Sequence, residues 1–180
     1  MIEQTNEIVR RLNRQVGHTL LPEARALIPE SGRLPSVYGR AKMSKSQGNA
    51  LALSATDDAI RAAVRRMYTA PDHLRVTDPG RVEGNVVFTY LDAFDPDRDT
   101  VHELKAHYRR GGLGETAVKR RLETVLLDLL APIRQRRAAW ADRSDDVRDI
   151  LRDGTRRARG VTHATLETVK DALGLFRMGQ

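Results

Sequence analysis

Apolar residues recur at helical spacing near the start of the chain. Ile8, Leu12 and Val16 follow one another at intervals of four residues, with mostly polar side chains between them. Because a helix turns once in about 3.6 residues, side chains at this spacing lie on one face. The pattern predicts an amphipathic helix over residues 4–16 that ends near Gly17.

Further segments after residue 54 are set off by residues that start or stop a helix, and three of them show the same spacing, within about residues 60–67, 118–133 and 147–173. Ser54 or Thr56 is suited to cap the first of them and Ser144 the last, because a short hydroxyl side chain accepts hydrogen bonds from first-turn amides. Pro132 lies inside the longest segment, and the apolar pattern continues beyond it, so a bend is expected there rather than a stop. The predicted helices run from the first cap to Pro71, then over about residues 85–94, 97–110, 115–140 and 144–173.

Between the first two predicted helices lies a long connection, residues 20–53, which contains three prolines and three glycines. Proline removes a backbone donor and glycine favours turns, so only short extended pieces are expected here. Connections of this length within compact domains are usually functional. We therefore expect a functional loop in this segment.

The short connections between the later helices predict antiparallel neighbours, and hence an all-α bundle from about Ala55 onward. The composition agrees, because aromatic residues make up only 4% of the chain while aliphatic residues dominate its apolar positions. A β-sandwich would be richer in aromatic and β-branched residues. The expected fold class is mainly α.

Charge and composition narrow the classes of partner and site. A formal net charge of +7 fits a polyanionic partner such as nucleic acid, although arginine-rich helix faces are often merely solvated. The absence of cysteine excludes disulfides and thiolate-bound metals, and five histidines without ligand spacing predict no metal site. No apolar run approaches a membrane span and no export signal opens the chain, so we expect a cytoplasmic protein without a membrane partner.

The richest candidate chemistry lies in the long connection, where Lys42-Met43-Ser44-Lys45-Ser46 is followed directly by Gln47-Gly48-Asn49. Ammonium groups are mobile point charges for phosphate oxygens, and hydroxyls and loop amides add directional donors. A glycine allows close backbone approach or a positive φ. The stretch therefore suits a polyphosphate, whereas an arbitrary loop of this composition would more often be a solvated surface.

This stretch resembles the KMSKS loop of class I aminoacyl-tRNA synthetases, in the K-M-S-K-S-x-G-N variant typical of the tryptophan-specific members. Residues 3–13 are similar to a helix that follows the substrate-binding segment in that family, with Leu12 where phenylalanine is usual. Further landmarks of the family's C-terminal half are similar to residues 83–92, 108–114 and 130–137. The resemblance implies a remnant of the catalytic nucleotide-binding domain at residues 1–54 and an α-helical, anticodon-binding-like domain at residues 55–180.

The same resemblance implies roles for individual residues. Lys42 and Lys45 would be the catalytic cations, and the ATP-binding set would be Lys42, Met43, Ser44, Lys45, Ser46 and Gly48. Mg²⁺ would accompany ATP in the complete enzyme, with no cofactor bound tightly by this chain and no metal site on it. The partner would be tryptophan tRNA, with the candidate contacts Arg109, Arg110, Lys119, Arg120 and Arg121.

The family's other ATP motif, of the H-I-G-H type, has no counterpart in these residues, and neither has its tryptophan-recognising Asp-Gln pair. Gly17-His18 is no substitute, because it lies in a connection after a helix rather than opening a helix after a strand. The resemblance therefore implies the C-terminal part of a tryptophan–tRNA ligase that is inactive as an isolated chain. The alternative is a non-catalytic module that binds tRNA or associates with a full-length synthetase. The possible protein partners are a full-length synthetase or a separate N-terminal half. A tyrosine-specific relative is the third possibility.

Overall fold

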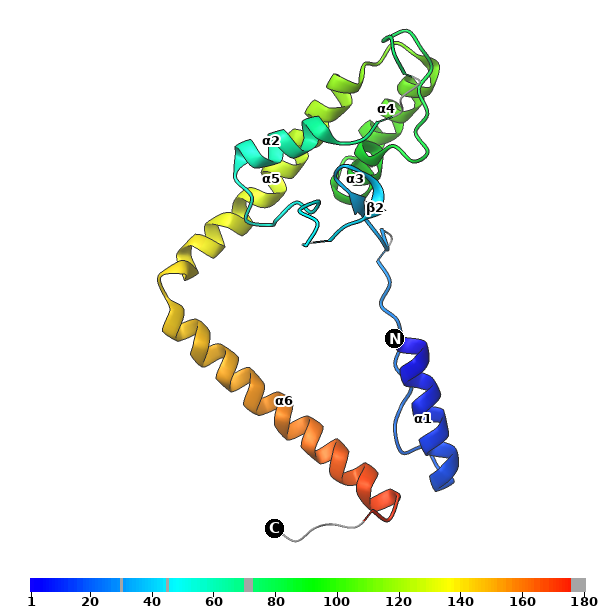
Figure 1. Cartoon of the computed structure of the whole chain (residues 1–180), viewed down its shortest axis with the longest axis vertical. Coiled ribbons are helices and arrows are strands. Elements are labelled where there is room, and N and C mark those ends of the chain that lie inside the picture. The colour runs from blue at the N-terminus through cyan, green and yellow to red at the C-terminus, as the bar shows by residue number, and fades with distance from the viewer. Residues whose placement is uncertain (30, 45, 70–72, 176–180) are drawn as a thin grey trace. The chain divides into compact units, whose positions relative to one another are not determined.

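The computed structural model describes residues 1–29, 31–44, 46–69 and 73–175, which form six helices and one two-stranded sheet (Figure 1). The chain divides into a compact unit at residues 29–142 and a second unit made of the terminal segments 1–28 and 143–180. The unit at 29–142 contains both the lysine-rich loop and the four helices that follow it. The predicted domain boundary at residue 54 stays a prediction.

The first helix, α1 (Ile2–Val16), confirms the prediction for this segment and ends at Gly17, which has φ 80°. Its buried residue is Val9, whereas Ile8 of the predicted stripe is 61% exposed. The reason is that residues 20–24 fold back along the helix. The Asn6 side-chain amide donates to the Ala24 carbonyl at 2.9 Å, and similar bonds from the helix hold Leu20, Leu21 and Glu23.

The sheet is an antiparallel hairpin of β1 (Pro35–Ser36) and β2 (Gly39–Lys42), with the pairs Pro35↔Lys42 and Ser36↔Gly39 and an irregular register between them. It confirms that the long connection holds only short extended pieces. Val37, in the turn of the hairpin, is only 1% exposed and belongs to the main hydrophobic core. The hairpin is thus fixed to the helices that follow it.

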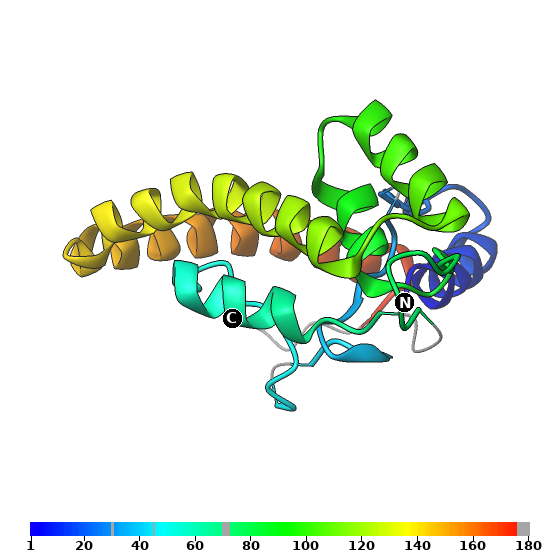
Figure 2. The same ribbon diagram turned by 90° about the horizontal axis from the view of Figure 1, so that it is seen from above.

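Four helices complete the unit at 29–142. They are α2 (Asp57–Arg66), α3 (Val86–Phe94), α4 (Arg98–Arg110) and α5 (Glu115–Ala141). Both views show α2 alongside α5 (Figures 1 and 2), and α3 packs against α5, α4 and β1. Most of α3 is buried, and its Val86, Phe88 and Leu91 are at most 1% exposed. Helix α3 therefore forms the centre of the core.

The helix boundaries follow the expected capping chemistry. The Thr56 hydroxyl accepts the Ala59 amide at 3.2 Å, so Thr56, and not Ser54, caps α2. Asn85 and Asp97 cap α3 and α4 in the same way, each at 3.0 Å. Helix α2 ends at Arg66, and the predicted stop at Pro71 lies outside the described residues.

Helix α5 continues through Pro132 without a break, which confirms that this proline does not end it. The last helix, α6 (Ser144–Ala172), corrects one prediction: Ser144 is its first helical residue and makes no capping bond. Arg143 occupies the cap position, and its Nε donates to the Asp146 carboxylate at 2.7 Å. The acidic first turn already favours the positive helix end, so the helix begins without a hydroxyl cap.

No residue of α6 is buried, although its apolar residues keep helical spacing. The mainly helical character is confirmed, and α3 packs on α4 and α5 while α2 packs on α5. The antiparallel bundle from about residue 55 onward stays a prediction. Within the described ranges, no helix combines the length and the apolar character needed to cross a membrane.

Candidate functional site

The lysine-rich loop starts where β2 ends. Lys42 is the last residue of that strand, and its side chain is exposed. Residues 46–48 form a turn in which Gly48 has φ 62°, a left-handed conformation that favours glycine. Lys45, the second predicted catalytic cation, lies outside the described residues. The described part of the loop thus presents one ammonium group to solvent from a defined backbone.

A buried asparagine at the end of this stretch holds the loop together. Asn49 is 8% exposed, and its Oδ1 accepts the Ser44 amide at 2.7 Å. Its Nδ2 donates to the Lys42 carbonyl at 3.2 Å and to Oε1 of Gln47 at 3.1 Å. The sequence interpretation noted Asn49 as part of the motif but gave it no role. The available signal was the tendency of an asparagine side chain to replace backbone partners in turns.

Two hydroxyls lie together on the loop. The Oγ atoms of Ser44 and Ser46 are 2.9 Å apart, so one hydroxyl donates to the other. The hydroxyl that accepts keeps its own hydrogen for a further acceptor. A phosphate oxygen is such an acceptor, and the Lys42 ammonium on the same loop supplies the matching charge. The phosphate-binding role of the two serines stays a prediction.

Two of the hollows beside the start of the loop differ in character. One, of about 370 Å³, is lined by Lys42 and by exposed Arg33, a second cation that the motif did not include. The other, of about 390 Å³, is almost wholly apolar and contains Met43 together with residues of α3 and α5. Met43 also packs against the main core. The loop is therefore charged on one side and anchored by packing on the other.

Of the five basic residues predicted to contact tRNA, three have partners within the protein. Arg121 donates to the buried Asp95 carboxylate through Nε at 2.7 Å and Nη2 at 2.8 Å. These bonds hold the pKa of Asp95 below its usual value. The Lys119 ammonium donates to the Arg65 carbonyl at 2.9 Å. Arg109 pairs with Glu83 at 2.6 Å, and this hydrogen bond lowers the pKa of the Glu83 carboxyl.

The other two basic residues have no ion pair within the described ranges. Arg110 ends α4 and Arg120 lies on α5, and both side chains are exposed. A polyanion meets such arginines without first breaking an internal bond. The structure thus divides the predicted set into residues held by the fold, above all Arg121, and residues whose charge faces solvent.

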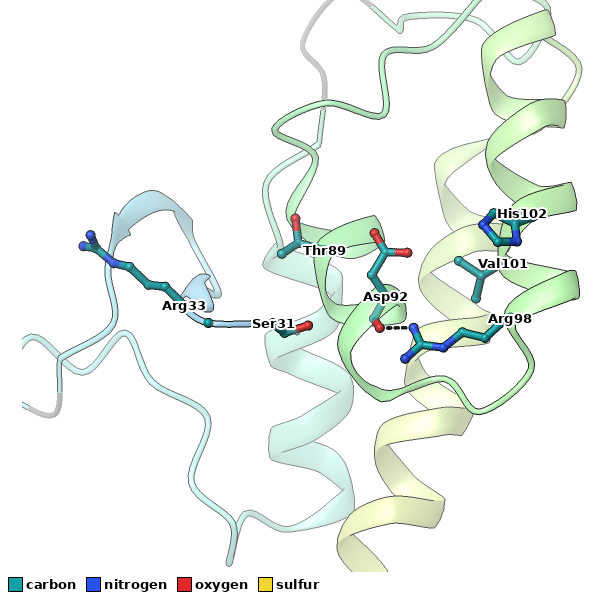
Figure 3. Close-up of a pocket in the computed structure, with 8 residues that line it drawn as sticks. Ser31, Arg33, Thr89, Asp92, Arg98, Val101 and His102 are labelled. Atoms are coloured by element: carbon teal, nitrogen blue, oxygen red, sulfur yellow. Dashed lines mark hydrogen bonds between the residues drawn. The ribbon is translucent and has the colours of Figure 1, made fainter. Parts of the chain in front are cut away.

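A further hollow, of about 540 Å³, lies between the segment before β1 and helices α3 and α4 (Figure 3). One carboxylate of its lining, Asp92, has partners within the protein. The Arg98 guanidinium donates to the Asp92 carbonyl, and the Lys105 ammonium lies 2.5 Å from the Asp92 carboxylate. In Figure 3 the Arg33 side chain points away from Asp92. This hollow was not expected from the sequence, and its lining carries two guanidinium groups, those of Arg33 and Arg98, against the single carboxylate of Asp92.

A buried polar cluster joins α4 to the start of α5. The Tyr108 hydroxyl donates to Glu115 at 3.3 Å, and the Thr69 hydroxyl donates to the other carboxylate oxygen at 2.5 Å. The His73 ring lies 4.6 Å from the Tyr108 ring. Burial raises the pKa of Tyr108 to about 12. These contacts position the helices rather than a ligand. Elsewhere too, the described residues include no group of three or more His, Asp or Glu side chains placed to hold a metal ion.

Comparison with known proteins agrees with the loop and the helices. A family model described as class I tRNA synthetases (W and Y) matches residues 1–131. The tryptophan–tRNA ligase of Clostridium longisporum is 49% identical over 177 residues, covering 97% of this chain and 52% of that protein. The ligase of Lactococcus lactis is 46% identical over 180 residues, covering 97% and 53%.

Among solved structures, the tryptophanyl-tRNA synthetase of Campylobacter jejuni superposes with a TM-score of 0.63 at 24% identity, covering 97% of this chain and 54% of that one. At that identity the likeness shows the fold alone. The chain spans about half the length of the curated relatives it matches. The family match over most of its residues, together with relatives that are tryptophan–tRNA ligases, shows that the chain belongs to the tryptophan and tyrosine family of class I tRNA synthetases.

Proposed function

We propose that this chain supplies the KMSKS loop and the tRNA-binding helices of a tryptophan–tRNA ligase. The observation that carries the proposal is the described part of the loop, residues 42–44 and 46–49. Lys42 and the Ser44–Ser46 hydroxyl pair lie on a backbone clamped by Asn49 and fixed to the core. The donors are those that a triphosphate needs, and nearly the full chain matches ligases for tryptophan.

The loop would act on the charge that develops during activation. When a carboxylate attacks the α-phosphate of ATP, the bond to pyrophosphate breaks and negative charge grows on the departing group. A cation that is already positioned stabilises this charge without reorganisation. Lys42 supplies one such cation, and the motif assigns the second to Lys45. By analogy with single donors in oxyanion sites, loss of either should cost roughly 3–4 kcal/mol of transition-state stabilisation.

Mg²⁺ accompanies ATP in this family, but the loop does not fit the ion. Its described donors are an ammonium, hydroxyls, backbone amides and one buried carboxamide whose oxygen is already bonded to Ser44. Mg²⁺ prefers carboxylate and water oxygens in octahedral geometry. We therefore assign no magnesium ligand to the loop.

For tRNA, the proposal ranks the predicted contacts by how free their charges are. Arg110 and Arg120 are ranked first and Arg109 second, because its partner Glu83 is itself exposed. Lys119 and Arg121 are ranked last, since contact with a phosphate would compete with buried or bidentate bonds. Substituting Arg110 or Arg120 should weaken tRNA binding uniformly and reduce its salt dependence, as expected for phosphate contacts.

The 180-residue chain alone is not expected to activate tryptophan. Proximity of the two substrates would depend on the remaining half of the ligase, which the matched relatives possess and which supplies the rest of the nucleotide site. The competing possibility is a module that binds tRNA without catalysis. Both predict binding to tRNA, so only a catalytic assay separates them.

The deciding experiment is tryptophan-dependent exchange of pyrophosphate into ATP. It would be run with this chain alone and with the chain fused to the preceding half of the Clostridium longisporum ligase. We expect exchange only in the fusion, lowered about a hundredfold or more by Lys42→Ala or Lys45→Ala. Lys170→Ala, which removes an ammonium from α6, is the matched control and should leave exchange unchanged. Exchange by the chain alone would refute the inactivity, and salt-sensitive tRNA binding with no exchange in the fusion would favour the non-catalytic module.

A further inference from the structure

Asn49 makes three side-chain hydrogen bonds, all to residues of the KMSKS loop. The orientation of its carboxamide is fixed by those partners: the Ser44 amide can only donate and the Lys42 carbonyl can only accept, so Oδ1 faces the first and Nδ2 the second. The two bonds join the beginning and the middle of the loop. Because Asn49 is 8% exposed, water has little access to replace them.

The backbone of the same residue reaches the core. The Asn49 carbonyl accepts the Val37 amide at 3.3 Å, and Val37 is 1% exposed inside the hairpin turn. One residue therefore links the loop, by its side chain, to the hydrophobic core, by its backbone. The third side-chain bond, to Gln47, goes to an exposed group and adds little to this linkage.

We propose that Asn49 is a positioning residue for ATP: it holds Lys42 and Ser44 of the KMSKS loop in one fixed backbone arrangement before the nucleotide arrives. The inference rests on the proposed function. Asn49 does not offer its own polar atoms to the ligand, since both are already bonded to the loop. It acts by setting the carbonyl of Lys42 and the amide of Ser44, and so the positions of the ammonium and hydroxyl that meet phosphate.

This role makes a specific kinetic prediction. Without the Asn49 hydrogen bonds, only a fraction of the molecules has the loop ordered before ATP binds. The apparent affinity for ATP is the intrinsic affinity multiplied by that fraction. Once ATP is bound the loop is in place, so turnover is little changed. Two lost hydrogen bonds of ordinary strength correspond to a KM for ATP raised roughly tenfold to a hundredfold, with kcat nearly unchanged. A merely structural role would instead reduce the active fraction, which lowers apparent kcat and leaves KM alone.

The test uses Asn49→Ala in the fused enzyme, with two controls. Asn85→Ala removes another buried asparagine, the cap of α3, and should lower thermal stability without changing KM for ATP. Gln47→Ala removes only the exposed partner and should change KM less than threefold. If Asn49→Ala lowers kcat at unchanged KM, the positioning role is overturned.

A second measurement needs no catalysis. Hydrogen exchange of the Ser44 amide in the 180-residue chain should be slow in the unmodified protein and roughly tenfold to a hundredfold faster in Asn49→Ala, while core amides of α3 keep their protection. Equal Ser44 exchange in both proteins would overturn the inference directly. Faster Ser44 exchange in a fusion that shows no pyrophosphate exchange would instead confirm the clamp and refute the proposed function.

Discussion

The bond between Arg121 and Asp95 separates a structural role from a tRNA-binding one. The Asp95 side chain is fully buried, and it accepts two hydrogen bonds from Arg121 and one from the Asp97 amide. Arg121 is 34% exposed, so its charge remains partly solvated while that of Asp95 is not. Replacing Arg121 by alanine therefore leaves a carboxylate in the core with a single remaining donor.

Protonation of Asp95 limits how much unfolding free energy the Arg121→Ala variant can lose. Breaking a buried pair by removing one partner costs about 3–5 kcal/mol. Asp95 can avoid part of this cost by becoming protonated, which at pH 7 requires about 4 kcal/mol for a carboxyl whose ordinary pKa is 3.8. Removing the Arg121 side chain, which is itself 34% exposed, also admits water to the Asp95 carboxylate. We expect Arg121→Ala to lower the free energy of unfolding by about 3 kcal/mol at pH 7.

Urea unfolding of the 180-residue chain, followed by circular dichroism, measures this loss. Arg120→Ala is the matched control, because Arg120 is the exposed neighbour of Arg121 and has no ion pair among the described residues. This substitution should change the free energy of unfolding by less than about 0.5 kcal/mol. A carboxyl whose pKa is lowered on folding contributes its full stabilisation at pH values above its pKa in the unfolded chain. That stabilisation is lost as pH falls through its pKa in the folded chain. The difference between Arg121→Ala and the unmodified chain should therefore shrink below about pH 4.

Two results would refute this reasoning. Unfolding of Arg121→Ala at the same urea concentration as the unmodified chain would show that the pair does not stabilise the core. A loss of stability that persists undiminished in acid would show that the carboxylate is not its origin. If Arg121→Ala weakened tRNA binding without any change in unfolding, Arg121 would belong among the tRNA contacts after all.

Three further predictions concern packing and titration. Burial raises the pKa values of Tyr90 and Tyr108 to about 12; because the unfolded phenols ionise near pH 10, stability should fall as pH rises from 10 to 12, as measured by urea unfolding, and an unchanged midpoint over that range would contradict it. Gly80→Ala should destabilise by about 1–3 kcal/mol, because its new methyl group would overlap the fully buried Tyr108 ring; a melting temperature equal to that of the unmodified chain would show that the ring can move. Thr56→Ala should cost about 1 kcal/mol by leaving the Ala59 amide without its cap, whereas Ser54→Ala, the alternative cap considered from sequence, should cost nothing measurable.

Local rules predicted the helices of the unit at 29–142 well. Apolar spacing located α2 and α5, and the turns at residues 78–80 and 95–97 located α3 and α4. Residues such as Thr56 and Asp97 begin helices because their side chains satisfy first-turn amides. The same rules failed at Ser144, where an acidic first turn stabilises the helix end without a hydroxyl cap. Capping and dipole effects favour neighbouring start positions, and one sequence does not decide between them.

Site residues were predictable only where the motif named them. Lys42 and the serines of the loop follow from chemistry that is local in sequence, and the structure brings them together. The partner of Arg121 lies 26 positions earlier in the chain, so its structural role emerges only when α5 packs beside the end of α3. Asn49 clamps the loop because the hairpin closes, and Arg33 lines the same hollow as Lys42 for the same reason.

Lys42 and Met43 are adjacent in the motif but have different surroundings. In an extended strand and just beyond it, neighbouring side chains point to opposite sides, and here Lys42 is exposed while Met43 packs on the core and lines the apolar hollow with α3 and α5. Tolerance to substitution should therefore follow two unrelated scales at adjacent positions. Position 42 should rank residues by charge, and position 43 by volume and hydropathy, so that leucine is accepted where lysine is not. A saturation scan of these two codons, read by pyrophosphate exchange for position 42 and by stability for position 43, would test this division between the two neighbouring positions.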